Sequence, residues 1–166
     1  MAATIQIISL HGATGSTETQ VDGGTMRFKA ADNDTADANN PLVISGSTIY
    51  SYIKQCRYKA TVAPSNLVDN LKFYTDGSSG MGTGVDIGVK TYASGSYVNP
   101  ATQGQSQVSG LTSVFTYTSG SALAVTGSQA STGLFGDIIN FQMSVTSAAT
   151  QGTTPSETFT FSFDES

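Results

Sequence analysis

Residues 49–75, IYSYIKQCRYKATVAPSNLVDNLKFYT, decide the fold class of this chain. In the first half, aromatic or apolar residues recur at alternate positions: Tyr50, Tyr52, Cys56, Tyr58, Ala60 and Val62. Successive side chains of a strand point to opposite faces, so this alternation predicts a half-buried β-strand. Pro64 interrupts the pattern, because proline cannot donate to a ladder, and a second alternating run follows. We therefore expect a pair of β-sandwich core strands with a wet, weakly basic outer face.

Further alternating runs are spread along the chain. They occupy residues 4–10, 26–30, 42–44, 85–91, 107–118, 122–125, 134–146 and 158–163. Loops rich in Gly, Ser, Thr, Asn and Asp separate them, notably residues 11–24, and no window has a helical period. Residues 1–166 are expected to form a single all-β domain, a jelly-roll-like antiparallel β-sandwich. A change of phase at Ile7 predicts a bulge there.

Composition excludes several classes of partner. Charged residues make up 11% of the sequence, against roughly 25% in an average soluble domain, and the net charge is −5. Nucleic-acid binders carry a basic patch, so no nucleic-acid partner is expected. No apolar run is long enough for a membrane span, and the first residues lack the basic and apolar regions of a secretory signal. The single cysteine, Cys56, is expected to be reduced and buried in the core.

Candidate catalytic residues are few. His11 is the only histidine, it follows a predicted strand beside Gly12, and no Gly-x-Ser-x-Gly elbow accompanies it. We therefore interpret His11 as a loop residue. The glycines of residues 80–84 lack the spacing of a dinucleotide-binding loop, and one His with one Cys cannot form a zinc site in a single chain. We expect no catalytic residue and no cofactor, and we predict that the protein is not an enzyme.

Metal and glycan binding are the alternatives. The loop DNDTADANNP at residues 32–41 carries three carboxylates, Asp32, Asp34 and Asp37, of the kind that bind calcium. Their spacing does not fit an EF-hand loop, so a solvated turn without metal is the simpler interpretation. If a divalent ion is bound, these three residues are the candidates. The seven tyrosines are possible platforms for sugars, although most lie in strand phase and are expected to pack.

The order of three stretches resembles that of tailed-phage virion structural proteins. The stretches are MRFKAADN at residues 26–33, IYSYIK at residues 49–54, and SN at residues 65–66 leading to NLKFYTDG at residues 70–77. They cover under half of the chain. The resemblance implies a capsid-associated β-sandwich without enzymatic activity, such as a decoration, cement or head-fibre protein. It carries no functional residue over to this sequence.

We therefore expect a structural protein on the outer surface of a phage head, made in the host cytoplasm. The expected partners are the major capsid protein and copies of the chain itself in a homotrimer, through polar and individually weak contacts. One alternative function is a carbohydrate-binding sandwich of a tail or fibre, possibly assisted by calcium. A polysaccharide-active enzyme is the third hypothesis.

Overall fold

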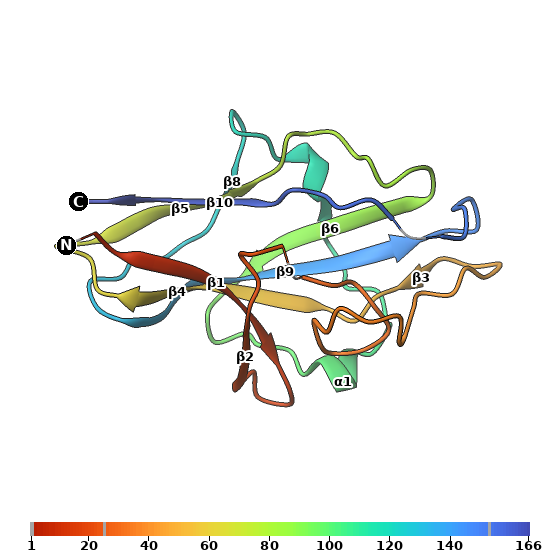
Figure 1. Cartoon of the computed structure of the whole chain (residues 1–166), viewed down its shortest axis with the longest axis horizontal. Helices are drawn as coiled ribbons and strands as arrows, with labels where there is room; N and C mark the ends of the chain where they lie inside the picture. Colours follow the sequence, from red (N-terminus) through yellow and green to blue (C-terminus); the bar gives the residue numbers. More distant parts are fainter. Residues whose placement is uncertain (1, 25, 153) are drawn as a thin grey trace.

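Two antiparallel β-sheets pack against each other in the computed structural model, which describes residues 2–24, 26–152 and 154–166 (Figure 1). The strands are β1 (Thr4–His11), β2 (Thr17–Gln20), β3 (Ile49–Tyr50), β4 (Lys54–Val62), β5 (Val68–Tyr74), β6 (Val85–Tyr92), β7 (Thr112–Ser113), β8 (Leu123–Ala124), β9 (Gly133–Val145) and β10 (Thr160–Glu165). Within the described ranges, helix is limited to one turn, α1 (Pro100–Gln103), and a 3-10 turn, Val114–Thr116. The predicted all-β antiparallel sandwich is confirmed.

The larger sheet has the strand order β2-β1-β4-β9-β6-β7, with β3 also paired to β9, and the smaller sheet has the order β10-β5-β8. The long strand β9 lies at the centre of the larger sheet. On one side it pairs with β4, as Ile139 does with Cys56, and on the other with β6, as Phe141 does with Val89. From β4 onward the chain passes repeatedly between the sheets, because β5, β8 and β10 belong to the smaller one.

The two halves of residues 49–75 lie in different sheets. β4 pairs with β1 and β9, whereas β5 pairs with β8 and β10. The two predicted strands therefore face each other across the core. The hydroxyl of Tyr58 in β4 bridges this core and donates to the carbonyl of Lys72 in β5 at 2.7 Å. The turn at Pro64 therefore carries the chain from one layer to the other.

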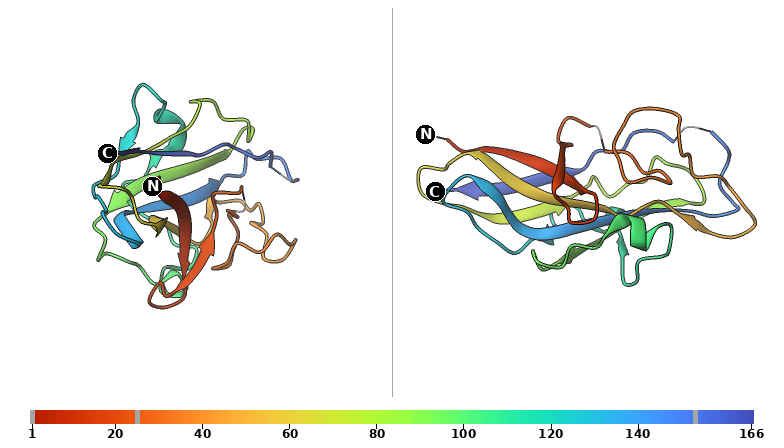
Figure 2. Two further views of the ribbon diagram at one scale, coloured as in Figure 1. Left: turned by 60° about the vertical axis from the view of Figure 1, so that its left-hand side comes forward. Right: turned by 90° about the horizontal axis from the view of Figure 1, so that it is seen from below.

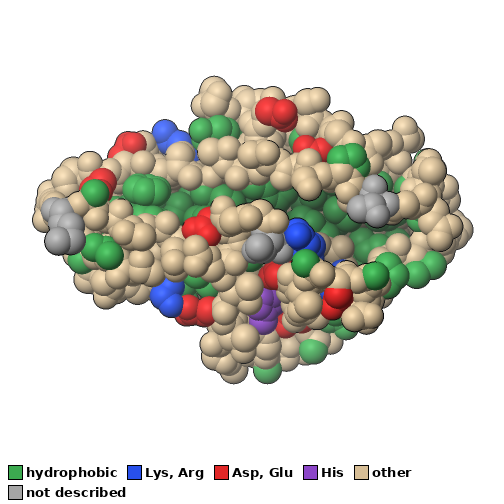
Figure 3. Space-filling view, in the orientation of Figure 1, with side chains coloured by type: hydrophobic (Ala, Val, Ile, Leu, Met, Phe, Trp, Pro, Cys, Tyr) green, Lys and Arg blue, Asp and Glu red, His purple; other side chains and the backbone are tan. Residues whose placement is uncertain are grey.

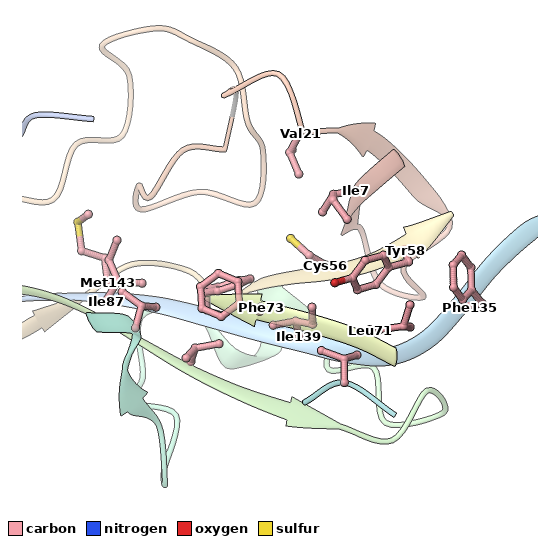
Figure 4. Packing of buried hydrophobic residues seen from close by; sticks show 14 of the residues in the cluster. Ile7, Val21, Cys56, Tyr58, Leu71, Phe73, Ile87, Phe135, Ile139 and Met143 are labelled. Carbon is pink, nitrogen blue, oxygen red and sulfur yellow. The ribbon is translucent and has the colours of Figure 1, made fainter. Parts of the chain in front are cut away.

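Phenylalanines from both sheets form the centre of the core. The ring of Phe73 lies 5.1 Å from that of Phe141, and Phe159 stacks on Phe141 at 5.3 Å. Figure 4 shows Phe73 of β5 among side chains of β4 and β9. Phe141 is fully buried, and Phe159 and Phe161 are partly buried against it. Cys56 is also fully buried, as predicted, and burial raises the pKa of its thiol.

Much of the outer face of the larger sheet is covered rather than wet. The amide of Gln55, a fully buried residue, donates to the carbonyl of Val98 at 2.6 Å and accepts from its N–H at 2.9 Å. Gln142 bonds to the backbone of the same covering segment, residues 93–108, which includes α1 (Figure 2). The prediction of a solvent-exposed outer face is therefore wrong at Gln55, which is buried. It is correct at Thr61, near the end of β4, which is exposed.

Several shorter predictions were wrong. The expected loop of residues 11–24 contains β2, which forms a hairpin with β1. Residues 26–30 and 42–44 form no strand, yet their apolar side chains still pack on the core: Met26, Phe28, Leu42 and Ile44. In residues 107–118 only β7 and the 3-10 turn are regular. The irregularity in β1 lies between Thr4 and Ile5 rather than at Ile7.

Both termini lie at the same end of the sandwich (Figures 1 and 2). The N–H of Ala3 donates to both carboxylate oxygens of Glu165 at 2.9 Å, which joins the start of β1 to the end of β10. In the part of the chain that the structure describes, no helix has the length and apolar character needed to cross a membrane.

Candidate functional site

Charged side chains join β1 and β4 to the irregular segment, residues 21–24 and 26–48. They are His11 at the end of β1, Lys54 at the start of β4, and Asp32 and Asp34 from the segment, and we call these four residues the polar cluster. The side chain of His11 is only 7% exposed. The expectation of a loop histidine was therefore wrong: His11 ends a strand and is buried against the segment that follows.

Both ring nitrogens of His11 face a carboxylate. Nδ1 lies 2.8 Å from Oδ1 of Asp32, and Nε2 lies 2.9 Å from Oδ2 of Asp34. A neutral imidazole has one N–H and cannot direct a proton at both carboxylates, whereas the imidazolium can. Burial alone would lower the pKa of His11, but the contacts with Asp34 and Asp32 outweigh it and raise that pKa above its ordinary value. The two carboxylates therefore favour the protonated form of His11.

Asp34 connects the two cations of the polar cluster. Its side chain is fully buried, and Oδ1 lies 3.4 Å from Nζ of Lys54 and accepts from the N–H of Arg27 at 2.8 Å. Burial would raise the pKa of Asp34, yet His11, Lys54 and the Arg27 N–H lower it to about 2. Burial lowers the pKa of Lys54, an effect that Asp34 opposes, and the ammonium also donates to the carbonyl of Asn33 at 2.7 Å.

The three candidate calcium ligands do not converge on one point. Asp32 and Asp34 share His11, whereas Asp37 accepts from Nζ of Lys29 at 2.7 Å, a bond that lowers the pKa of Asp37. Across residues 2–24, 26–152 and 154–166, no three His, Cys, Asp or Glu side chains are grouped to hold a metal ion. The carboxylates serve instead as partners for cations of the chain.

The polar cluster fastens a long irregular segment to the sheet. Asp32 also accepts from the N–H of Gly12 at 2.8 Å, and the hydroxyl of Tyr97 donates to the Gly12 carbonyl at 2.7 Å. Burial, followed by the charge of Asp32, raises the pKa of Tyr97 to about 12. Because His11 and Asp34 are buried and face each other, a substrate has no access to them, and their chemistry is that of a structural anchor.

An apolar groove runs along one side of the sandwich (Figure 3). Its volume is about 1310 Å³, which exceeds the roughly 300–1,000 Å³ of ordinary small-molecule sites. One wall is formed by Ile5 and Ile7 of β1 with Val21, and the other by Phe161 and Phe163 of β10. The irregular segment, residues 149–152 and residues 154–159 line the remainder.

The groove exists because the two sheets have unequal widths. β10 lies over β4, since the ring of Phe161 is 6.1 Å from that of Tyr58 and the Tyr58 hydroxyl donates to the Ser162 carbonyl at 3.2 Å. In the larger sheet β1 and β2 lie beyond β4, whereas β10 is the edge of the smaller sheet. The inner face of β1 therefore extends past the smaller sheet (Figure 1), and Figure 4 shows Ile7 and Val21 on this side of the core.

The largest exposed hydrophobic side chains gather at this groove. Among the described residues, only Val43 and Phe163 are large, hydrophobic and exposed, at 70% and 37%, and both line the groove. Apolar side chains concentrated on one surface indicate an interaction site rather than random exposure. The groove is therefore the best candidate for a functional site.

Sequence reasoning missed both the polar cluster and the groove. Lys54 occupies the apolar phase of the residue 50–62 run, so its phase was a signal for a buried, paired cation. The groove has no such local signal, because it depends on which strands the smaller sheet lacks.

The tyrosines do not form an exposed platform for sugars: Tyr58 is buried and the other six are half-buried.

Comparisons of the chain with protein-family models, with curated proteins and with solved structures gave no match.

Proposed function

We propose that this protein is a non-enzymatic structural protein of a tailed-phage virion, a decoration or cement protein that binds the outside of the head and stabilises it. It acts through protein–protein contacts with the major capsid protein and with copies of itself. Two observations support the proposal: the resemblance of three sequence stretches, and the apolar lining of the groove.

The apolar groove carries the proposal. Each Å² of apolar surface removed from water contributes about 25 cal/mol to the free energy of association. A groove lined by apolar side chains that is open in the free chain therefore favours binding of a partner. Exposed apolar surfaces of this extent are typical of sites where proteins assemble. The attachment we propose is therefore more apolar than the hydroxyl-rich contacts that composition suggested.

The polar cluster supports the non-enzymatic part of the proposal. Its histidine and carboxylates pair with one another and with Lys54 beneath the surface. Such an arrangement makes the segment of residues 21–48 a fixed wall of the groove, which suits a protein that must present a constant surface to many equivalent positions.

A reconstitution experiment tests the proposal. Purified protein is mixed with capsids that lack it, and we expect saturable binding in many copies per particle and a higher temperature of capsid disruption. The double variant Val43→Ser/Phe163→Ser should fold normally and bind capsids much more weakly, because both side chains are already exposed in the free protein. The matched control, Thr83→Ser/Thr112→Ser, changes two exposed side chains that belong to no groove wall of β1 or β10.

Attachment to tails or to host glycans, without binding to capsids, would contradict the proposal. So would capsid binding that the Val43→Ser/Phe163→Ser variant retains in full, because the groove would then have no part in it.

A further inference from the structure

We infer that the groove receives an extended, uncharged segment of another protein chain, which adds to the smaller sheet as a fourth strand alongside β10. The inference deepens the proposed function and rests on it for the identity of the partner, since it specifies which kind of segment the virion supplies. It rests on the free edge of β10, the apolar lining that β1 gives the groove and the charge balance of that lining.

The edge of β10 that faces the groove carries backbone groups ready to pair. β10 is the edge strand of its sheet, and within the described residues its one partner strand is β5. Leu67 and Ser166 exchange both backbone hydrogen bonds, at 3.2 and 2.9 Å. Such bonds alternate along an antiparallel strand, and the register shift between Ser162 and Asp164 places its extra residue in β5, so the alternation continues along β10. The N–H and C=O groups of Phe161 and Phe163 therefore point away from β5, toward the open side. A strand added there would satisfy these groups.

The space beside β10 suits one strand. A fourth strand would lie about 4.8 Å from β10 in the plane of the smaller sheet, and it would cover the inner face of β1 about 10 Å below. That face lines the groove with Ile5, which is partly exposed, and with Ile7, which like Val21 is only 5% exposed. The six residues of β10 provide an edge about 20 Å long. The edge of a second sandwich is bulkier than this strip, because its own larger sheet would meet the projecting β1–β2 hairpin.

The chemistry of the walls specifies the occupant. Inward side chains of the added strand would contact the isoleucines of β1 and the phenylalanines of β10, so every second residue should be large and apolar. The charged residues of the lining nearly balance: Asp22, Asp37 and Glu157 against Arg27 and Lys29. A near-neutral groove does not favour a charged segment. An acyl chain would fill the apolar volume but would leave the edge of β10 unpaired.

The test uses three synthetic peptides on the full chain. The parent peptide alternates valine and threonine over eight residues, with capped ends and one terminal lysine for solubility. The second is N-methylated at every valine and the third at every threonine. Alternate amides of a strand point to opposite edges, so one methylated peptide loses its bonds to β10 and the other loses none.

We expect saturable binding of the parent peptide, measured by fluorescence anisotropy. One methylated peptide should bind at least about tenfold more weakly, since several hydrogen bonds of about 0.5–1.5 kcal/mol each are removed, and the other should bind like the parent. Equal binding of both methylated peptides overturns the inference, as does binding of dodecanoate with no binding of any peptide. Absence of peptide binding overturns it, and so does self-association of the free protein that buries β10.

Variants at the edge of β10 provide an independent check. Phe163→Pro removes the outward N–H and should abolish peptide binding, whereas Phe163→Leu keeps the N–H and an apolar side chain and should retain it. If the proline variant does not fold, the methylated peptides still decide. Capsid binding separates the two proposals: peptide addition without capsid binding refutes the virion role alone, and capsid binding without peptide addition refutes the added strand alone.

Discussion

The two ends of β1 are covered in opposite ways. At its C-terminal end, His11 is sealed against the segment of residues 21–48 by two carboxylates. Toward its N-terminal end, Ile5 and Ile7 face a groove that the smaller sheet does not reach. The chain pairs the charges of one end by itself, whereas the apolar side chains of the other end line an open groove. The open groove is therefore limited to one part of β1, and the polar cluster holds the irregular segment beside it.

The physical reason for the difference is the cost of each kind of exposure. A buried ion without its partner costs several kcal/mol, so each charge of the polar cluster must be matched within the chain. An uncovered apolar strip costs less and regains that free energy when a partner covers it.

Removing the central anion should break the sealed end most severely. Asp34→Asn leaves His11 and Lys54 buried beside a neutral amide, and we expect the free energy of unfolding to fall by about 3–5 kcal/mol. Urea denaturation measures the change. The matched control is Asp76→Asn, an exposed carboxylate that accepts a bond from Ser78, where a change within about 0.5 kcal/mol is expected. Equal effects at the two positions would show that the polar cluster is not an anchor.

The covered outer face should respond less strongly. Gln55→Ala leaves the N–H and C=O of Val98 without their side-chain partner, and the expected loss of stability is about 1–3 kcal/mol. Gln107→Ala, at an exposed glutamine of the same covering region, serves as the control and should be near neutral. Faster amide exchange across residues 93–108 should accompany the first change only.

The sealed end should also loosen as the pH rises. The pKa of His11 is raised in the folded state, so its contribution is complete below the unfolded value of 6.5 and is lost as the pH passes through the folded value. His11 is the only histidine, and no other side chain ordinarily titrates near neutrality. Unfolding midpoints in urea should therefore decline between about pH 6 and pH 8 in the native chain, below the range in which the Cys56 thiol of the unfolded chain ionises. The variant His11→Gln should have a flat profile there; a decline that persists in this variant would refute the assignment.

The smallest effect on the isolated protein is expected at the open end. Phe163→Ser should change the free energy of unfolding by less than about 1 kcal/mol, because the ring is already 37% exposed. Phe141→Ala, at a fully buried ring of the core, should cost about 3–5 kcal/mol. Similar costs at both positions would mean that Phe163 is core and that the groove is closed in solution.

How far the sequence predicted this molecule depends on whether a feature is local. The alternation in residues 134–146 and 85–91 predicted β9 and β6 and their inward faces, because a side-chain period of two is read along one strand. The partners of β4 and β5 were not predictable from their proximity in sequence, since a Pro-containing turn can connect strands of one sheet or of two. The sequence identified the acidic loop that holds the candidate metal ligands, but the pairing of that loop with His11 and Lys54 depends on residues 20 or more positions away.

Hydrogen exchange on capsid particles tests the central claim, that the open side of the sandwich is where the protein attaches. Amide exchange is measured for the free protein and for the protein bound to capsids that previously lacked it. We predict that protection rises at Phe161 and Phe163 of β10 and around Val21, while residues 93–108 remain unchanged. Protection gained on residues 93–108, with no change along β10, would contradict the account.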